Sequence, residues 1–366
     1  MTLRKTARLG ALLTSSAAVL VALSPSAYAW GGDDPGKQPA PPANKPAGGA
    51  SGNTLMAGGT SVTVKQVSGG KGGGGGSSAK TVTPVDPNWK PPSCWYEPVA
   101  TPEELKAGVE KVKNGEGRDA GTVPVTPSLG WGEELMVDHY EKGKTQSDGA
   151  EGYKNYNIGK KGMFWRGVMN PDVEDTFEAR DCEQLLFWQN ANTVPDIPNS
   201  PTPKVLASYA YNKIKVPDTK VELKPEAASK VNMPTWVWLD KGTFEDVKVR
   251  AELPGTGLWA ETTAKPVALH LEPGTGDATT FPASGDCKIN DDGSIGTPYT
   301  KGSSKQDPPC GIAYLRSTNG TPFQMKASLT WEISWEGSGG TGGDLPNGTF
   351  DGTQAIDVEE VQSVNR

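Results

Sequence analysis

The chain has 366 residues, of which 22% are charged and 35% are hydrophobic, and its formal net charge at pH 7 is −7. An acidic chain repels phosphate groups, so nucleic acids and anionic membrane surfaces are excluded as expected partners. The composition predicts an acidic, soluble protein.

The first 29 residues have the three parts of a secretory signal peptide. Three cations come before an apolar run over residues 9–23, and residues 27–29 read Ala-Tyr-Ala, a small-x-small cleavage signature. Cleavage after residue 29 removes those three cations and changes the formal charge from −7 to −10. No later stretch approaches the about 20 apolar residues that a bilayer requires. We therefore expect a secreted, extracellular protein without an integral membrane segment.

Four cysteines in an exported chain predict two disulfides, because an oxidising compartment preserves them. They are Cys94, Cys182, Cys287 and Cys310. Three pairings are possible, and we favour the local one, Cys94 with Cys182 and Cys287 with Cys310. A zinc site is the weaker interpretation, since no two cysteines have finger-like spacing, and we expect no metal and no cofactor.

Residues 30–89 are rich in Gly, Pro, Ala, Ser and Lys, and they contain few large apolar side chains. Such a segment cannot bury enough surface to offset its ordering entropy, so we expect a disordered extracellular arm. One heptapeptide, residues 61–67, has strand-like composition between glycine pairs. Its valines, Val62, Val64 and Val67, are candidates for a partner-binding strand that adds to the edge of another protein's sheet, and the alternative is plain linker.

Residues 90–218 are expected to form a small mixed, mostly helical region. Thr101-Pro102-Glu103-Glu104 predicts a helix start with a capping box, and this helix should end near Lys113. Further helices are expected over residues 172–189 and 203–213, where apolar side chains recur at helical spacing.

Residues 219–366 show the alternation of β-strands. From Phe323 to Glu336, seven apolar side chains alternate with seven polar ones, which predicts a long strand with one wet face. Shorter strands are expected over residues 247–253, 267–271 and 236–239. Several strands without intervening helices predict an antiparallel β-sandwich, so the whole chain should be mostly β.

Two acidic patterns are candidates for chemistry. Glu332 and Glu336 share a strand face, as a pair of glycosidase carboxylates would, but charges that alternate with apolar residues favour a solvated face. Asp291 and Asp292 stand before Gly293, a sequence that could supply calcium ligands. The same sequence is typical of an ordinary turn, which is the interpretation that we favour. We assign no catalytic residue and expect no enzymatic activity.

Histidine and tryptophan give weaker signals. The two histidines, His139 and His270, form no triad pattern, and the chain contains no nucleophile elbow, phosphate loop or dinucleotide fingerprint. Four of the 11 tryptophans lie in apolar runs and should pack in the core. Trp131, Trp165 and Trp259 have small or polar neighbours, so they are the candidates for exposed rings that stack on a ligand.

Four short sequences from residue 231 onwards resemble uncharacterised secreted proteins of high-GC Gram-positive bacteria: PTWVWL at 234–239, GTPY at 296–299, PPCG at 308–311 and TWEISW at 330–335. The order of elements after Thr263 is similar to that of a diverged polycystic-kidney-disease-type (PKD) immunoglobulin-like domain, which implies that the β-sandwich is of the immunoglobulin/PKD type. In that family a Trp-x-Phe-Gly-Asp-Gly sequence is usual, and here residues 269–274 read LHLEPG. The resemblance implies extracellular adhesion or assembly and brings no enzymatic residue.

These observations together predict a secreted, non-enzymatic binding or assembly protein, with an extracellular protein as the expected partner. The alternative is a carbohydrate-active protein, either a sugar-binding module or a glycoside hydrolase of unrecognised type, with a polysaccharide as the partner.

Overall fold

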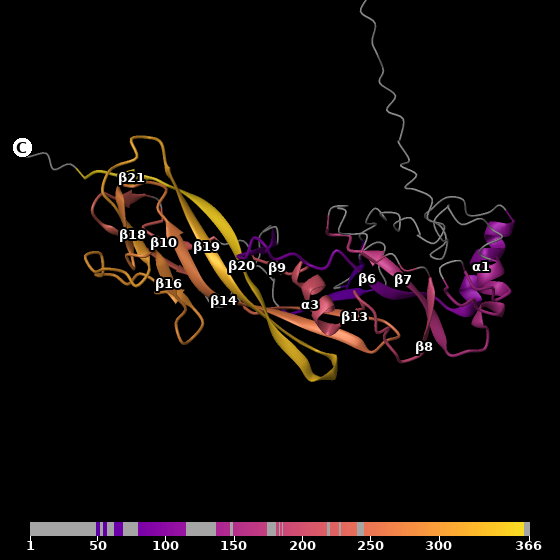
Figure 1. Cartoon of the computed structure of the whole chain (residues 1–366). Helices are drawn as coiled ribbons and strands as arrows, with labels where there is room; N and C mark the ends of the chain where they lie inside the picture. Colours follow the sequence, from indigo (N-terminus) through magenta and orange to yellow (C-terminus); the bar gives the residue numbers. More distant parts are fainter. Residues whose placement is uncertain are drawn as a thin grey trace, which may run out of the picture. The chain divides into compact units, whose positions relative to one another are not determined.

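A computed structural model of the chain describes residues 49–51, 54–56, 62–68, 80–114, 137–146, 149–173, 181–182, 184, 186–217, 220–226, 228–239 and 245–361. The predicted signal peptide and the last five residues lie outside this part of the chain. The described residues are mostly β, with few helices, and their sheets are antiparallel except for one two-stranded pair (Figure 1). Among the described residues, no helix is long and apolar enough to cross a membrane.

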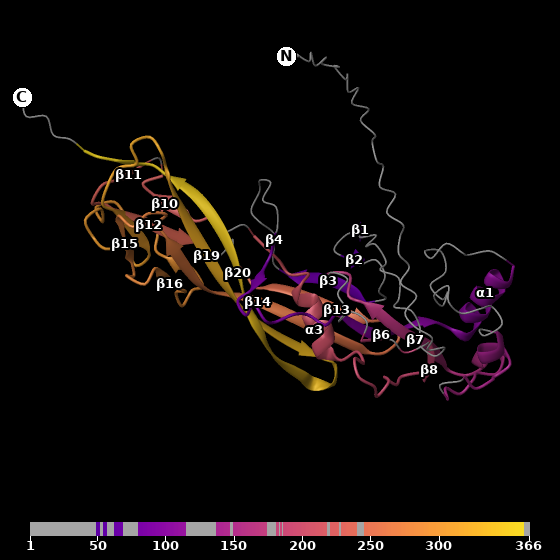
Figure 2. The same ribbon diagram turned by 45° about the horizontal axis from the view of Figure 1, so that its top comes forward.

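The largest sheet has nine strands in the order β1-β2-β3-β13-β14-β19-β20-β5, with β16 added beside β14. Its strands are β1 (Gly49–Ser51), β2 (Thr54–Met56), β3 (Thr63–Ser68), β5 (Thr83–Pro84), β13 (Val247–Leu253), β14 (Leu258–Glu272), β16 (Asp286–Lys288), β19 (Phe323–Gly337) and β20 (Thr341–Ile356). The short helix η4 (Ser338–Gly340) joins β19 to β20 as a long hairpin (Figure 2).

Side chains on β19 alternate between core and solvent as the sequence predicts. Met325, Leu329 and Ile333 are buried, whereas Gln324 and Glu332 are exposed. The same alternation continues on β13, so the strands predicted over residues 247–253 and 323–336 are confirmed. Period-two burial follows directly from the pleat of a strand, which is why the pattern predicts these elements well.

A second antiparallel sheet has the order β10-β12-β18-β15, with β17 beside β12. It consists of β10 (Glu222–Lys224), β12 (Pro234–Leu239), β15 (Ala278–Phe281), β17 (Ile295–Gly296) and β18 (Gly311–Tyr314). Its β18 is joined to the large sheet by the stacked rings of Tyr314 and Phe323, whose centroids are 5.3 Å apart. Two small pairs complete this part: β11 (Ser229–Lys230) with β21 (Val358–Glu359), which are parallel, and β4 (Lys80–Thr81) with β9 (Lys215–Val216).

A three-stranded sheet lies in the region predicted to be mostly helical. It contains β6 (Cys94–Ala100), β7 (Gly162–Met169) and β8 (Phe187–Asn190). The helices here are α1 (Pro102–Lys113), α3 (Pro203–Tyr211) and the short η1 (Val137–Glu141) and η2 (Asn155–Asn157).

The capping box predicted for α1 is present. Thr101 donates its backbone N–H to Glu104 Oε2 at 2.8 Å, and Glu104 returns its N–H to Thr101 Oγ1 at 3.2 Å. The helix predicted over residues 203–213 is confirmed as α3, with Thr202 as its N-cap. The helix predicted over residues 172–189 is wrong, because its C-terminal part is strand β8, whose aromatic side chains pair with β7.

Helix α3 packs on the large sheet. All residues from Leu206 to Tyr211 are buried, and Thr262 on β14 donates its hydroxyl to the carbonyl of Ala207 at 3.0 Å. One buried cluster accordingly joins α3 and β6 to both large sheets, while a smaller aromatic cluster lies around Tyr140 and Phe164. The boundary predicted between residues 218 and 219 does not coincide with a break in this core.

The predicted arm is corrected for residues 49–51, 54–56, 62–68 and 80–89, which the structure describes as strands or as packed on the core. Strand β3 pairs with β13 in the large sheet, and Val62 and Val64 are only 2% and 0% exposed. Trp89 packs on Tyr211 with ring centroids 4.8 Å apart. Both valine side chains belong to the main buried cluster, and β3 is paired on both edges within the chain, so the prediction that the heptapeptide is a free docking strand is wrong. The local composition predicts a linker, because composition carries no information about the distant strand with which the segment pairs.

Candidate functional site

Both predicted disulfides are present. Cys94 is bonded to Cys182 across a sequence separation of 88 residues, and Cys287 is bonded to Cys310 across 23. Among the described residues no free cysteine exists. Disulfides of this kind indicate an oxidising environment. The second bridge ties β16 of the large sheet to the residue that precedes β18 of the second sheet.

The predicted acid pair lies on a solvated face. Glu332 and Glu336 are exposed on β19, where their cross-strand neighbours on β14 are Lys265 and Glu261. Glu332 thus has a cation opposite it, as is ordinary for a wet strand face, and Lys248, 3.1 Å from Glu261, supplies a cation beside the other pair. The residues around Asp292 form a turn: the Asp292 carboxylate accepts the N–H and the hydroxyl of Ser294, at 2.9 and 2.6 Å. Among the described residues, no group of three or more His, Cys, Asp or Glu side chains is placed to hold a metal ion.

The three tryptophans predicted to be exposed do not form a platform. Trp165 is 3% exposed in the core beside β6, so its candidacy is wrong. Trp259 is half-buried, and the guanidinium of Arg250 lies 3.9 Å from the centroid of its ring. The ring face that this cation covers is not available for a ligand to stack on. Trp131 lies outside the described residues.

A hollow in the described part of the chain lies where β14 ends and β15 begins. It is open to solvent and has a volume of about 600 Å³. This volume is within the range of about 300–1,000 Å³ that is typical of small-molecule sites. Its lining consists of His270, Leu271, Glu272, Pro273, Gly274, Thr275, Gly276, Ala278, Thr279, Thr280, Ala283 and Ser284. The chain thus brings one end of the large sheet and the edge strand of the second sheet around a polar space.

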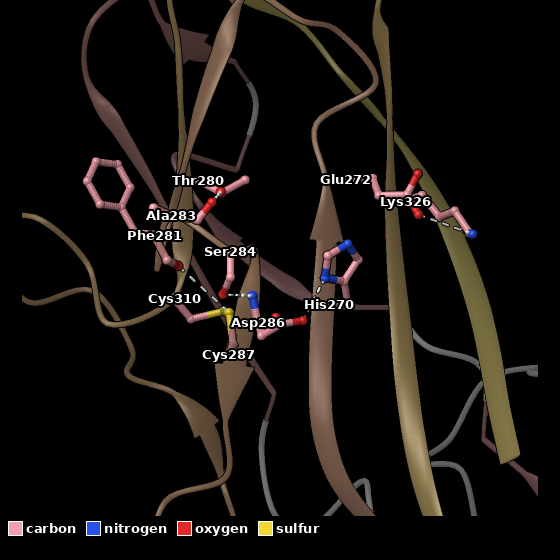
Figure 3. Close-up of polar contacts among 10 residues, drawn as sticks. All are labelled: His270, Glu272, Thr280, Phe281, Ala283, Ser284, Asp286, Cys287, Cys310 and Lys326. Carbon is pink, nitrogen blue, oxygen red and sulfur yellow. Dashed lines mark hydrogen bonds and ion pairs between the residues drawn. A yellow bond between two sulfur atoms is a disulfide. The ribbon is translucent and has the colours of Figure 1, made fainter. Parts of the chain in front are cut away.

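A histidine–aspartate pair stands at the edge of this hollow (Figure 3). His270 on β14 and Asp286 on β16 are directly opposite in the ladder, and Nδ1 of the imidazole lies 2.7 Å from Asp286 Oδ1. The hydrogen bond from His270 is the main reason that the pKa of the Asp286 carboxyl is below its ordinary value of 3.8. The other ring nitrogen points away from this carboxylate in Figure 3.

Gly285 allows the pair to form. It has a φ of +80°, and an added Cβ would lie 2.7 Å from the carbonyl oxygen of Leu271 and 3.1 Å from the His270 ring. Its own carbonyl accepts the N–H of Leu271 at 2.9 Å. Any other residue would meet both the left-handed backbone and the strand beside it. Glycine at this position therefore brings the loop directly against the imidazole.

The hydroxyl groups of the hollow hold its loops. Thr280 donates its hydroxyl to the carbonyl of Ala283 at 3.1 Å, and Ser284 Oγ accepts the N–H of Asp286 at 3.2 Å. Thr275 Oγ1 accepts the N–H of Asp277 at 3.2 Å. These side-chain-to-backbone bonds order the turns on both sides of the hollow before any ligand arrives.

Charges near the hollow are paired. Glu272 accepts a hydrogen bond from Lys326 on β19 at 3.3 Å, and Lys326 also lies 3.1 Å from the carboxylate of Asp351. Arg316 contacts Asp277 on the far side of the turn. The lining itself contains no Lys or Arg side chain, so the hollow offers no free cation to an anionic partner.

No family model, curated protein or solved structure matches this chain. The resemblance to secreted Gram-positive proteins and to PKD domains therefore stays a prediction.

Sequence reasoning missed this hollow. In the sequence His270 belongs to no triad pattern, and Asp286 stands 16 residues after it. The available signal was Ser284-Gly285-Asp286, a polar-Gly-polar sequence that favours a turn between short strands. The other histidine, His139, is buried, and its Nδ1 lies 3.2 Å from the carbonyl oxygen of Lys144. It therefore packs beside the smaller aromatic cluster and does not line the hollow.

Proposed function

We propose that this protein is a secreted, non-enzymatic binding or assembly protein, and that the hollow beside His270 is where its partner docks. The observation that carries the proposal is the preorganised lining. The hydroxyls of Thr275, Thr280 and Ser284 are already bonded to the loops that display them. Groups used in this way keep a surface in one shape, which lowers the entropy that binding costs.

The same contacts argue for binding rather than chemistry. A catalytic serine needs its hydroxyl within hydrogen-bond reach of the base. Ser284 instead receives a backbone N–H from Asp286, while the near nitrogen of His270 is committed to the carboxylate of that same residue. The pair therefore orients an imidazole without activating a nucleophile of this chain.

The architecture proposed for the C-terminal part is an immunoglobulin-like, PKD-type sandwich. Its support is the pair of antiparallel sheets, the Cys287–Cys310 bond between them and the Tyr314–Phe323 stack. Loops at the end of such a layered structure are common binding sites, because the sheets hold them rigidly. Export through the predicted signal peptide is consistent with the two disulfides.

A carbohydrate-active protein is the second candidate. The hollow is lined by hydroxyl groups, a carboxylate and an imidazole, which are the groups that hydrogen-bond to sugars. Trp165 is buried and Arg250 lies over Trp259, so neither ring serves as a stacking platform. Sugar binding would therefore depend on hydrogen bonds alone.

The test fills the hollow. Thr279→Trp places a bulky ring in its lining, and Thr353→Trp, on an exposed position of β20, is the matched control. Extracellular proteins and extracellular polysaccharides, purified separately, are presented to each full-length secreted variant in a biolayer binding assay. We expect at least one class to bind the wild type and the control and to bind the Thr279→Trp protein at least tenfold more weakly. Equal binding by all three proteins, or none by the wild type, would overturn the proposal.

A further inference from the structure

The tautomer of His270 follows from its partner. Asp286 keeps its carboxyl ionised, since its pKa lies below the ordinary value of 3.8, and an ionised carboxylate only accepts hydrogen bonds. The Nδ1 atom at 2.7 Å must therefore carry the proton. In a neutral imidazole the second nitrogen, Nε2, then has the lone pair and acts as an acceptor. Figure 3 shows this nitrogen directed away from Asp286.

The loop contacts determine what the other polar groups can still do. Thr280 uses its only hydroxyl proton on Ala283, so what remains to it is acceptor capacity. Ser284 and Thr275 are in the opposite state, because each accepts a backbone N–H. Within the described part of the chain, their hydroxyl protons have no acceptor, so both can donate to a ligand. The hollow thus offers acceptors and donors within one small space.

The charges and the side chains of the lining restrict the class of ligand further. Lys326 is shared between Glu272 and Asp351, and the lining contains no Lys or Arg side chain, so an anionic ligand finds no free cation here. The lining contains no Phe, Tyr or Trp side chain, which leaves no ring face for stacking. A ligand for this lining needs groups that can both donate and accept hydrogen bonds. Hydroxyl groups do both at one atom and carry no charge.

We infer that the hollow binds a neutral polyhydroxylated ligand, a segment of carbohydrate, with Nε2 of His270 accepting a ligand hydroxyl and the hydroxyls of Ser284 and Thr275 donating to others. The inference rests on the proposed function, because it assigns a ligand class to the same hollow. Asp286 acts as a positioning residue: it holds the imidazole in the accepting tautomer. Binding should be weak to moderate, since a hydrogen-bonded, open site lacks the apolar contact area of a deep pocket.

The probes are three soluble hexasaccharides, namely cellohexaose, maltohexaose and chitohexaose, each titrated into the full-length secreted protein by calorimetry up to about 10 mM, the weak end of specific binding. His270→Ala removes the acceptor. His270→Gln keeps a side-chain oxygen at nearly the same reach, and Thr353→Ala on exposed β20 is the control. Thermal unfolding of each variant verifies that it is folded.

We expect at least one hexasaccharide to bind, with a dissociation constant that rises about tenfold in His270→Ala, partly recovers in His270→Gln and is unchanged in Thr353→Ala, as for one lost hydrogen bond. The ¹⁵N spectrum of the His270 side chain should show a protonated Nδ1. Saturating sugar should shift the Nε2 signal of His270 strongly and its Nδ1 signal little. No binding of any hexasaccharide, or equal binding by His270→Ala, would overturn the inference. If Thr279→Trp still abolished binding of an extracellular protein, the proposed function would stand without it; if Thr279→Trp changed nothing, the docking site itself would be wrong.

Discussion

Replacement of Val64 tests whether β3 belongs to the sheet. The Val64 side chain is fully buried against the main core, whereas Val67, three residues along the same strand, is 50% exposed. Val64→Ala removes two buried methyl groups at about 0.8 kcal/mol each and leaves a small cavity, so we expect a loss of about 2 kcal/mol of unfolding free energy. Val67→Ala should change it by less than about 0.5 kcal/mol.

The assay is urea unfolding followed by tryptophan fluorescence, together with thermal unfolding. For a domain of 150–250 residues, a loss of about 2 kcal/mol corresponds to a fall of about 4–8 °C in the midpoint. A segment that hangs free of the body has no core contacts to lose, so it would give the same midpoint for Val64→Ala, Val67→Ala and the wild type. Such a result would refute the ladder between β3 and β13 and would restore residues 62–68 to a linker.

Two further predictions concern the hollow. Gly285→Ala should lower the unfolding free energy by about 1–2 kcal/mol, because the φ of Gly285 is +80°, in the left-handed region, and the added Cβ would lie too close to the His270 ring. Gly276→Ala is the control: no atom lies within 4 Å of its added Cβ, so its thermal midpoint should equal that of the wild type. The pKa of Asp286 is lowered by its hydrogen bond to His270, so the stability that this bond contributes is present above pH 3.8 and is lost as the pH falls through the folded-state pKa. In a ¹³C titration of the Asp286 carboxyl, His270→Ala should move the midpoint upward toward 3.8; an unmoved midpoint would mean that the pair does not form in solution.

Much of the fold could be predicted because its information is local. The long strand β19 is visible in the sequence as strict alternation, and its burial repeats with the same period of two. The start of α1 is visible as a capping box, since both of its hydrogen bonds join residues three apart. The local cysteine pairing is also correct, which agrees with the lower entropy of closing shorter loops.

Elements that depend on distant partners could not be predicted in this way. Val64 is paired with Ala251, and no periodicity within one heptapeptide reveals a partner so far along the chain. The helix expected over residues 172–189 fails for a related reason. Phe187 and Trp188 have the apolar mass of a helix face, but pairing with β7 determines their conformation, and aromatic residues suit strands at least as well.

The hollow shows why a list of polar residues does not by itself identify a ligand. Composition gives His270, Thr280 and Ser284 as groups that can donate or accept in several ways. Folding removes most of this freedom. Nδ1 of His270 donates to Asp286, and the Thr280 hydroxyl donates to the carbonyl of Ala283. The Ser284 hydroxyl oxygen accepts a backbone N–H. What a ligand meets is the remainder, an accepting imidazole beside donating and accepting hydroxyls. The ligand class that we propose rests on the hydrogen bonds within these loops, and these depend on the register of β14 with β16, where His270 stands opposite Asp286.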